Sequence, residues 1–98
     1  MRNEIKTKIY DHLLNKYKDK QLIVAIEELS ELQKEFCKAL RGQDNIKNII
    51  EEMADVEIML EQMKIYLGID EDVLVTEKIY KLWRVFEREL NGSKGVEQ

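Results

Sequence analysis

The sequence predicts an all-α protein, an antiparallel bundle of about four helices in a single domain, residues 1–98. Three observations predict this fold class. The chain contains no proline, the residue that most strongly disrupts helices. Apolar residues recur every three or four positions along most of the chain, which is the helical period. Glycine and acidic residues stand where this period is interrupted, as they do at helix ends and starts.

The first predicted helix covers residues 3–17, where apolar residues recur every four positions. Asp19 follows it and is expected to cap the second helix, over residues 20–41. Each helix is expected to bury one apolar stripe. The stripes are Ile5, Ile9, Leu13 and Tyr17 in the first helix and Leu22, Ala25, Ile26, Leu29, Leu32, Phe36 and Leu40 in the second.

Gly42 is expected to end the second helix, because glycine readily adopts the left-handed backbone of a helix terminus. Asp44 is then expected to cap the third helix, over residues 45–67, and Gly68 to end it. The stripe that this helix is expected to bury consists of Ile46, Ile49, Ile50, Met53, Val56, Leu60, Met63 and Leu67.

Asp70 is expected to cap the fourth helix, over residues 71–90. Residues 91–98 are polar and glycine-containing, which predicts a flexible tail. The connections after the second and third helices are short, so neighbouring helices are expected to run antiparallel. The fourth helix is expected to bury Val73, Ile79, Trp83, Phe86 and Leu90.

Composition excludes several classes of protein. Twenty acidic residues against sixteen Lys and Arg give a net charge of −4, which argues against a nucleic acid as partner. No apolar run is long enough to span a membrane, and the N-terminus lacks an apolar signal region, so a cytoplasmic location is expected. Cys37 and His12 are single residues of their types, which excludes disulfide pairing within the chain and a Cys/His zinc site. A helical chain of this length buries a modest core, so a homo-oligomer is expected.

An acidic heptad is repeated on the second and third predicted helices. Residues 26–32 read Ile-Glu-Glu-Leu-Ser-Glu-Leu, and residues 50–56 read Ile-Glu-Glu-Met-Ala-Asp-Val. At about 100° per residue, each copy places two carboxylates at the edge of the apolar stripe. Antiparallel packing of the two helices lets these pairs face each other. The four carboxylates belong to Glu28, Glu31, Glu52 and Asp55.

Four carboxylates gathered at the edge of a core repel one another. A pair about 5 Å apart costs about 3 kcal/mol at an effective dielectric constant near 20. Such a cluster persists when some carboxylates take up protons or when a cation neutralises them. Ligands that are all oxygen select Mg²⁺ or Mn²⁺ over zinc. From the spacing alone, a metal site and a pair of solvated acidic strips remain alternative interpretations.

The acidic repeat resembles the paired metal-binding motif of the all-alpha nucleoside triphosphate pyrophosphatases, the MazG-like group. The resemblance covers residues 22–88 and is greatest to the small single-domain bacterial and phage members. Doubled acids, as found in both copies here, are also typical of that group. The motif consists of Glu28-x-x-Glu31, twenty intervening residues and Glu52-x-x-Asp55, with Glu27 and Glu51 completing the doubled acids.

This resemblance implies a helical bundle that binds Mg²⁺ through the four carboxylates and works as a homodimer or a dimer of dimers. It implies hydrolysis of an NTP or dNTP to the monophosphate and pyrophosphate, by attack of a metal-activated water at the α-phosphorus. Many members carry a Lys, an Asn and an Arg late in the last helix, where they hold phosphates. Here no Asn lies between Lys78 and Arg88, which leaves the phosphate contacts and the preferred base open.

Other charged residues are candidates for a part in this reaction. Glu27 is a weak candidate for orienting the attacking water, as is Glu51, although a solvated role is the simpler interpretation of both. A basic strip on the fourth helix is either a phosphate clamp or a set of ordinary helix-end cations. Lys34 and Lys38 are lesser candidates for phosphate binding. The basic strip consists of Lys78, Lys81, Arg84 and Arg88.

Structural roles are favoured for several other residues. Trp83 is able to stack on a base, but it lies on an apolar stripe, which favours packing in the core or in a dimer. His12 has no nucleophilic partner in the sequence, and Cys37 is interpreted as a small apolar residue. Three charged residues near the apolar side of the third helix suggest an intersubunit salt bridge. They are Glu57, Glu61 and Lys64.

Two other functions compete with hydrolysis. A non-enzymatic helical interaction module, with solvated acidic strips, is the main alternative. A carboxylate di-iron protein is disfavoured, because it needs a His in each of two Glu-x-x-His motifs and the one His lies outside both acidic copies. Binding of a divalent ion separates the enzyme from the interaction module.

Overall fold

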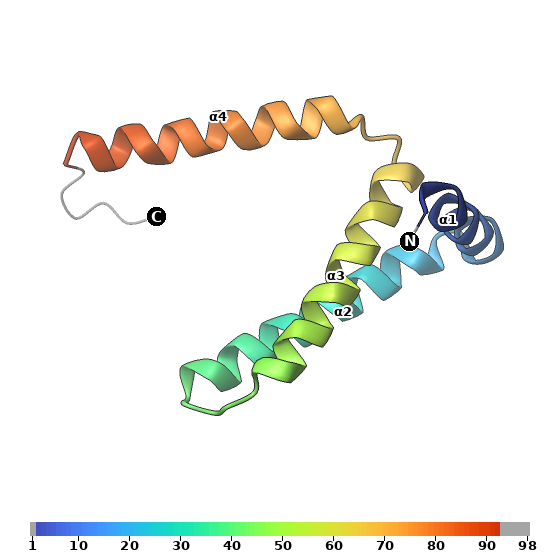
Figure 1. The fold of residues 1–98 in the computed structure, drawn as a ribbon, viewed down its shortest axis with the longest axis horizontal. Coiled ribbons are helices and arrows are strands. Elements are labelled where there is room, and N and C mark those ends of the chain that lie inside the picture. Colours follow the sequence, from blue (N-terminus) through green and yellow to red (C-terminus); the bar gives the residue numbers. More distant parts are fainter. Residues whose placement is uncertain (1, 93–98) are drawn as a thin grey trace. The chain divides into compact units, whose positions relative to one another are not determined.

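The computed structural model describes residues 2–92, which form four α-helices (Figure 1). No β-strand occurs in this range, and the prediction of an all-α protein is confirmed. Each helix begins and ends within one residue of its expected bounds. Of the predicted flexible tail, residues 93–98 lie outside the described residues. The helices are α1 (Asn3–Tyr17), α2 (Lys20–Leu40), α3 (Ile46–Tyr66) and α4 (Glu71–Leu90).

Glycine ends α2 and α3, as expected. Gly42 and Gly68 have φ angles of 88° and 67°, a left-handed backbone that costs glycine little because it has no Cβ. Asp70 caps α4, since its carboxylate accepts a hydrogen bond of 2.7 Å from the backbone N–H of Asp72. The glycine and aspartate residues therefore predict three of these helix boundaries for the correct physical reason.

The two other predicted caps are wrong. Asp19 has a helical backbone and makes no capping hydrogen bond, because its carboxylate accepts a hydrogen bond from the Tyr66 hydroxyl instead. Asn45, and not Asp44, occupies the position before α3. The Asn45 side chain does not cap the helix either: its Nδ2 donates to Glu35, and its Oδ1 has no hydrogen-bond partner among the described residues.

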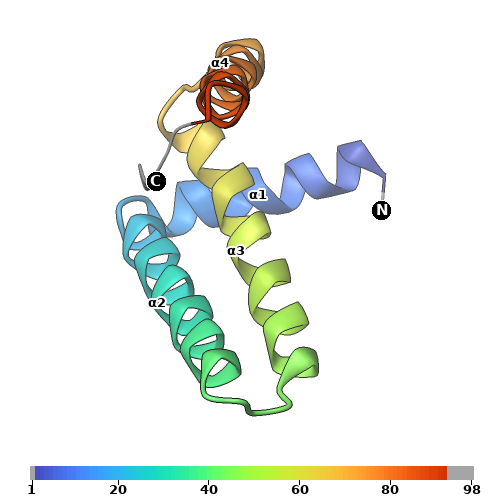
Figure 2. The same cartoon turned by 90° about the vertical axis from the view of Figure 1, so that its left-hand side faces the viewer.

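The chain divides into two compact units, each of which is described by itself. The first, Met1–Gly68, contains α1, α2 and α3, and the second, Ile69–Gln98, contains α4. Within the first unit α2 and α3 run antiparallel side by side, and α1 packs against both of them (Figures 1 and 2). The five-residue connection 41–45 explains the antiparallel pairing, because so short a loop returns the chain along the preceding helix.

The apolar core of the first unit is small and lies where α1 packs against α2 and α3. Three half-buried residues, Leu22, Val24 and Tyr66, surround it. The buried members come from all three helices, so the core holds the unit together. They are Leu14, Ala25, Met59 and Met63.

The prediction of buried apolar stripes in α2 and α3 is only partly correct. Ala25, Val56 and Met63 are buried as predicted, but most other members are exposed, Leu40 to 88%. The reason is the rotation of α2 about its own axis, which turns polar residues such as Glu35 toward α3. The apolar stripe of α2 therefore lies beside the contact between the two helices and not in it. The exposed members are Ile26, Leu29, Phe36 and Leu40 in α2 and Ile46, Ile50, Met53, Leu60 and Leu67 in α3.

The face that α1 buries also differs from the predicted one. Tyr10 and Leu14 are buried, whereas Ile5, Ile9 and Tyr17 of the predicted stripe are exposed. The polar end of the buried tyrosine explains the offset, because its hydroxyl reaches a carboxylate of α3. A tyrosine buries its ring at low cost when its hydroxyl finds such a partner.

Helix α4 buries none of its residues. The predicted burial of an apolar stripe does not occur within the unit of α4, because the described part of that unit contains no second helix to pack against. The predicted stripe is exposed in full, at Val73, Ile79, Trp83, Phe86 and Leu90.

Polar contacts connect the helices of the first unit. The Gln21 Nε2 atom donates a buried hydrogen bond of 2.8 Å to Gln62 Oε1, between α2 and α3. The Tyr10 hydroxyl donates a hydrogen bond of 2.7 Å to Glu61 Oε1, and Lys6 Nζ lies 3.4 Å from the same oxygen. Burial and the Glu61 carboxylate raise the pKa of Tyr10 to about 12. Glu61, a member of the suggested intersubunit bridge, is thus engaged within its own chain.

A buried carboxylate anchors the other end of the α2–α3 hairpin. Glu35 is 7% exposed and accepts hydrogen bonds from Asn45 Nδ2 at 2.7 Å and from Lys38 Nζ at 3.1 Å. The same Asn45 nitrogen donates to the backbone carbonyl of Glu35 at 2.9 Å. The Asn45 hydrogen bond, followed by that of Lys38, lowers the pKa of Glu35. Hydrogen bonds from Asn45 therefore attach the connection between α2 and α3 to the charged carboxylate of Glu35 and to its backbone.

Replacing Gln62 with Ala is expected to lower the free energy of unfolding by about 2 kcal/mol, because it leaves a cavity and the buried Gln21 amide without its partner. Urea unfolding followed by circular dichroism measures this change. The exposed residue Ile58 of the same helix provides the control, and Ile58→Ala is expected to change stability by less than about 0.5 kcal/mol. Equal effects of the two substitutions would contradict a structural role for the glutamine pair.

Stability is expected to fall in acid partly through Glu35. Its pKa is lower in the folded than in the unfolded state, so its contribution is complete above the usual value of 4.5 and is lost as the pH falls through the folded pKa. Glu35→Gln is therefore expected to lose less stability than the wild type between about pH 5 and pH 3. Urea unfolding at both pH values measures this difference. Glu4→Gln, at an exposed position, is expected to keep the wild-type pH dependence.

Candidate metal centre

Three of the four predicted carboxylates converge between α2 and α3. Glu28, Glu52 and Asp55 each offer one carboxylate oxygen, and these three oxygens lie within 4.8 Å of one another. Glu28 comes from α2 and the other two from one turn of α3, so antiparallel pairing brings them together. Glu28 and Glu52 are half-buried, whereas Asp55 is exposed. The group therefore offers oxygen ligands from two helices and remains accessible from solvent.

The surroundings of Glu28 disfavour its charged form. Partial burial raises the pKa of Glu28, and the negative charge of Asp55 raises it further. A hydrogen bond with Glu52 and the charges of Glu52 and Glu31 act in the same direction. Two carboxylates about 5 Å apart repel by about 3 kcal/mol at an effective dielectric constant near 20. Uptake of a proton or a cation by the group would relieve this repulsion.

One buried oxygen of Glu52, Oε1, has no donor among the described residues 2–92. A buried acceptor without a donor costs about 1–3 kcal/mol, and an ion or water is a common reason for its persistence. The donor set consists of carboxylate oxygens and carries up to three negative charges, which fits Mg²⁺ or Mn²⁺.

Glu31 lies beside this group but outside it. Its charge contributes to the raised pKa of Glu28, while its own Oε2 atom lies 3.4 Å from Lys34 Nζ. An exposed ion pair of this kind is weak, so it does not hold Glu31 away from a cation. Glu27 and Glu51 are exposed and are not among the three converging carboxylates. The metal-ligand role of Glu31 and the water-orienting role of Glu27 stay predictions.

The lesser phosphate candidates of α2 pair with neighbouring acids. Lys34 contacts Glu31, and Lys38 contacts the buried Glu35 at 3.1 Å. Cys37, predicted to be a small apolar residue at the edge of the stripe, is exposed beside them. These residues line a shallow pocket of about 390 Å³ on the outer surface of α2. Its lining consists of Ser30, Gln33, Lys34, Cys37, Lys38 and Arg41.

The basic strip of α4 belongs to the second unit. Lys81 Nζ lies 3.7 Å from Glu77 Oε2, and the Arg84 guanidinium lies 5.8 Å from the centre of the Tyr80 ring. Both contacts form within α4. The phosphate-binding role of Lys78, Lys81 and Arg84 stays a prediction. A small pocket of about 210 Å³ on this helix is lined by Lys81, Arg84, Val85 and Arg88.

The aromatic candidates are exposed. Trp83 packs edge-on against Phe86 of the same helix, with ring centres 5.4 Å apart and an angle of 71° between the planes. Together with Ile79 and Leu82 they line a shallow apolar pocket of about 250 Å³. His12 of α1 is also exposed. No helix in the described residues 2–92 places an imidazole beside the converging carboxylates.

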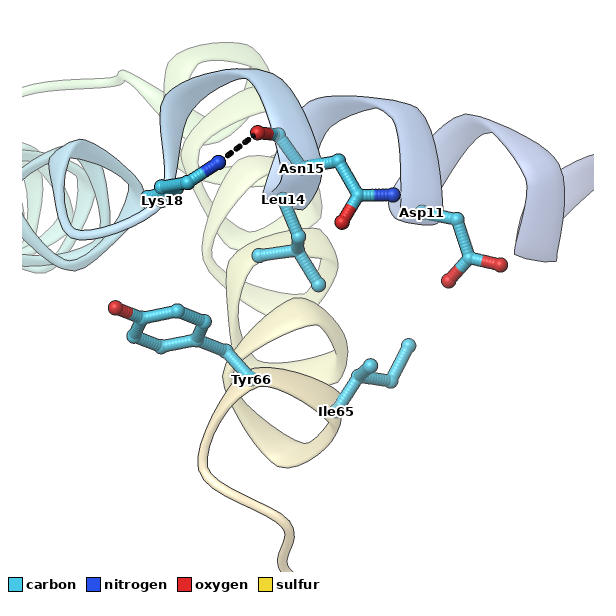
Figure 3. A pocket seen from close by; sticks show the side chains of 6 residues that line it. All are labelled: Asp11, Leu14, Asn15, Lys18, Ile65 and Tyr66. Atoms are coloured by element: carbon cyan, nitrogen blue, oxygen red, sulfur yellow. Dashed lines mark hydrogen bonds between the residues drawn. The ribbon is translucent and has the colours of Figure 1, made fainter.

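A pocket of about 400 Å³ between α1 and α3 was not predicted from the sequence (Figure 3). Leu14 of α1 faces Ile65 and Tyr66 of α3 across it, and Lys18 Nζ donates a hydrogen bond of 2.6 Å to the Asn15 carbonyl at its rim. The sequence carries no signal for this pocket, because it depends on how α1 packs against α3. Its lining consists of Asp11, Leu14, Asn15, Lys18, Ile65 and Tyr66.

No family model, no curated protein and no solved structure matches this chain. The resemblance to the MazG-like group therefore rests on the acidic repeat and stays a hypothesis. None of the helices in the described part of the chain has a stretch both long and apolar enough to cross a membrane.

Replacing Glu28 with Gln is expected to stabilise the metal-free protein by about 1 kcal/mol, because it removes one charge from a repelling group that is partly screened by solvent. We expect Mg²⁺ or Mn²⁺ to raise the Tm of the wild type and not that of this variant. Thermal unfolding in EDTA and in titrated metal measures both effects. Glu27→Gln, one position away and exposed, is expected to behave as the wild type. A full metal response in Glu28→Gln would remove Glu28 from the ligand set.

Proposed function

We propose that this protein is a Mg²⁺-dependent nucleoside triphosphate pyrophosphohydrolase, which converts an NTP or dNTP to the monophosphate and pyrophosphate. The observation that carries the proposal is the convergence of Glu28, Glu52 and Asp55 from two helices. The resemblance of the acidic repeat to the MazG-like group supplies the type of reaction. Mn²⁺ is the proposed substitute for Mg²⁺, because it shares the preference for oxygen ligands.

The charge of the protein supports a role for a cation between chain and substrate. A net charge of −4 and a cluster of carboxylates repel a triphosphate. Bound divalent cations reverse the local sign and are able to bridge carboxylates and phosphates. Lys78, Lys81 and Arg84 are the proposed contacts to the phosphates, since three cations on one helix match the charge of a polyphosphate.

The carboxylates have different parts in this proposal. Glu28 and Glu52, half-buried on α2 and α3, and the exposed Asp55 would hold the cation. Glu31 is the proposed fourth ligand, and Glu27 is the weak candidate for orienting the attacking water. Mg²⁺ supplies neutralisation of the phosphate charge and a lowered pKa of water.

A second candidate function is a non-enzymatic helical interaction module. The observation that favours it is the set of large apolar residues that the single chain leaves exposed, including Leu29, Phe36, Met53 and Leu60. In that function the acidic repeat forms solvated strips and no divalent cation binds specifically. The two functions therefore differ in metal binding and in turnover.

The decisive experiment incubates the purified chain with a panel of NTPs and dNTPs in Mg²⁺ and identifies the products by chromatography. Monophosphate and pyrophosphate are expected. Glu28→Gln and Asp55→Asn are each expected to lower kcat/KM by about 100-fold or more, which corresponds to about 3 kcal/mol. Circular dichroism checks that both variants keep the wild-type helix content.

Glu51→Gln is the matched control, because Glu51 lies beside Glu52 but is exposed and outside the converging group. It is expected to keep activity within a few-fold of the wild type. Diphosphate and phosphate as products would contradict the proposed position of cleavage. Absence of turnover and of metal binding would favour the interaction module.

A further inference from the structure

The pocket between α1 and α3 combines an apolar wall with a row of polar groups (Figure 3). The apolar wall consists of the buried Leu14 and of Ile65 and Tyr66, which face it from α3. The Tyr66 hydroxyl donates a hydrogen bond to Asp19, which holds the aromatic ring in place. The volume of about 400 Å³ lies within the range of small-molecule sites.

The polar groups of the pocket follow one face of α1. Asp11, Asn15 and Lys18 are four and three residues apart, a spacing that places side chains on the same side of a helix. At a rise of about 1.5 Å per residue, Asp11 and Lys18 are about 10 Å apart along the helix axis. The pocket therefore presents a carboxylate, then a carboxamide, then an ammonium group.

These polar groups are available to a ligand. All three residues are exposed. Among residues 2–92, neither the Asp11 carboxylate nor the side-chain amide of Asn15 takes part in a hydrogen bond or an ion pair. Lys18 Nζ donates to the Asn15 carbonyl, but an ammonium group has three donors, so two remain for other acceptors.

The backbone of Lys18 is unusual for a lysine. Its φ angle is 50°, in the left-handed region that disfavours every residue with a Cβ. Gly42 and Gly68 occupy the positive-φ positions after α2 and α3, where glycine adopts this backbone without strain. After α1 the chain instead has a lysine, and the side chain of that lysine lines the pocket. A ligand that needs the ammonium group accounts for this exception.

The order of the polar groups identifies the chemistry of the ligand. A carboxylate at one end and an ammonium group at the other bind a cation and an anion, so the ligand carries both charges. The carboxamide between them offers donors and an acceptor, which a peptide group requires. The charged ends of an extended dipeptide lie about 7 Å apart, which with a hydrogen bond at each end is close to the spacing of Asp11 and Lys18.

Two other classes of ligand match the pocket less well. The phosphate of a nucleotide would be attracted by a single lysine and repelled by Asp11 and by Asp19, which contacts the Tyr66 hydroxyl. A free amino acid carries both charges, but they lie only about 3–4 Å apart and so match the spacing of Asp11 and Lys18 less closely.

We propose that this pocket binds a zwitterionic dipeptide with apolar side chains, its ammonium group on Asp11 and its carboxylate on Lys18. The site uses no metal and none of the converging carboxylates. Ile65 follows Asp55 by ten residues on α3, which is about 15 Å along the helix, so this ligand does not occupy the candidate metal centre. The proposal therefore goes beyond the proposed function and is independent of it.

Calorimetric titration of the full chain with leucyl-leucine in EDTA tests the site. N-acetyl-leucyl-leucine and leucyl-leucinamide are matched probes, because each lacks one of the two terminal charges. Both are expected to bind at least about tenfold more weakly than leucyl-leucine. Methyl NMR shifts locate the probe, and they are expected at Leu14 and Ile65 and not at Ile50, which lies about 22 Å from Ile65 along α3.

Substitutions test the orientation of the dipeptide. Asp11→Asn is expected to weaken leucyl-leucine about tenfold and to leave N-acetyl-leucyl-leucine unchanged, because the acetylated probe has no ammonium group. Lys18→Gly is expected to weaken leucyl-leucine about tenfold without lowering the Tm, since glycine adopts a φ of 50° without strain. Lys16→Gln is the control and is expected to keep wild-type binding, because Lys16 is exposed outside the pocket.

Several results would overturn the proposal. They are the absence of binding at millimolar leucyl-leucine, equal affinities for the free and the end-capped probes, unchanged binding by Asp11→Asn, and shifts confined to residues outside the pocket. Tighter binding of leucine or of a nucleoside monophosphate than of leucyl-leucine would assign the pocket to another class of ligand. A lowered Tm of Lys18→Gly with unchanged binding would assign Lys18 to the helix end alone.

Discussion

Carboxylates face inward in the α2–α3 contact where apolar side chains are usual, and much of the structure depends on this fact. Near the connection between the helices, Lys38 forms an ion pair with Glu35 and Asn45 donates a hydrogen bond to it. Farther along, Glu28 and Glu52 have no such cation among residues 2–92, and burial raises the pKa of Glu28. The inward-facing carboxylate at one end of the contact is thus paired within the chain, while those in the middle repel one another, which a proton or a cation would relieve.

The position of the apolar core follows from the same constraint. With acids in the middle of the hairpin, apolar packing is concentrated where α1 meets α2 and α3, around Leu14 and Ala25. The buried pair of Gln21 and Gln62 lies at that end and fixes the relation of the two helices through a hydrogen bond. Several large apolar residues of α2 and α3, including Leu29, Phe36, Met53 and Leu60, lie to one side of the hairpin, where the single chain leaves them exposed.

Separation of the two sides has a functional consequence. A metal centre needs access to solvent and substrate, whereas an interface excludes solvent. On the α2–α3 hairpin the exposed Asp55 leaves the converging carboxylates open to solvent, while Leu29, Phe36 and Met53 follow inward-facing residues by about 100° of helix rotation and lie on the other side. The carboxylates and these apolar residues therefore do not share one face of the hairpin.

The sequence by itself determined the helices and most of the candidate site. The period of the apolar residues and the positions of the glycines predicted the helix boundaries. The repeated acidic heptad predicted that Glu28, Glu52 and Asp55 converge. Tertiary structure alone decided that Glu35 is buried, that Glu31 lies beside the group and that the apolar stripes are largely exposed. The helical period gives the angles between residues on one helix, but it leaves free the rotation of that helix about its own axis. That rotation depends on contacts with helices distant in sequence, including polar contacts that an apolar pattern does not contain.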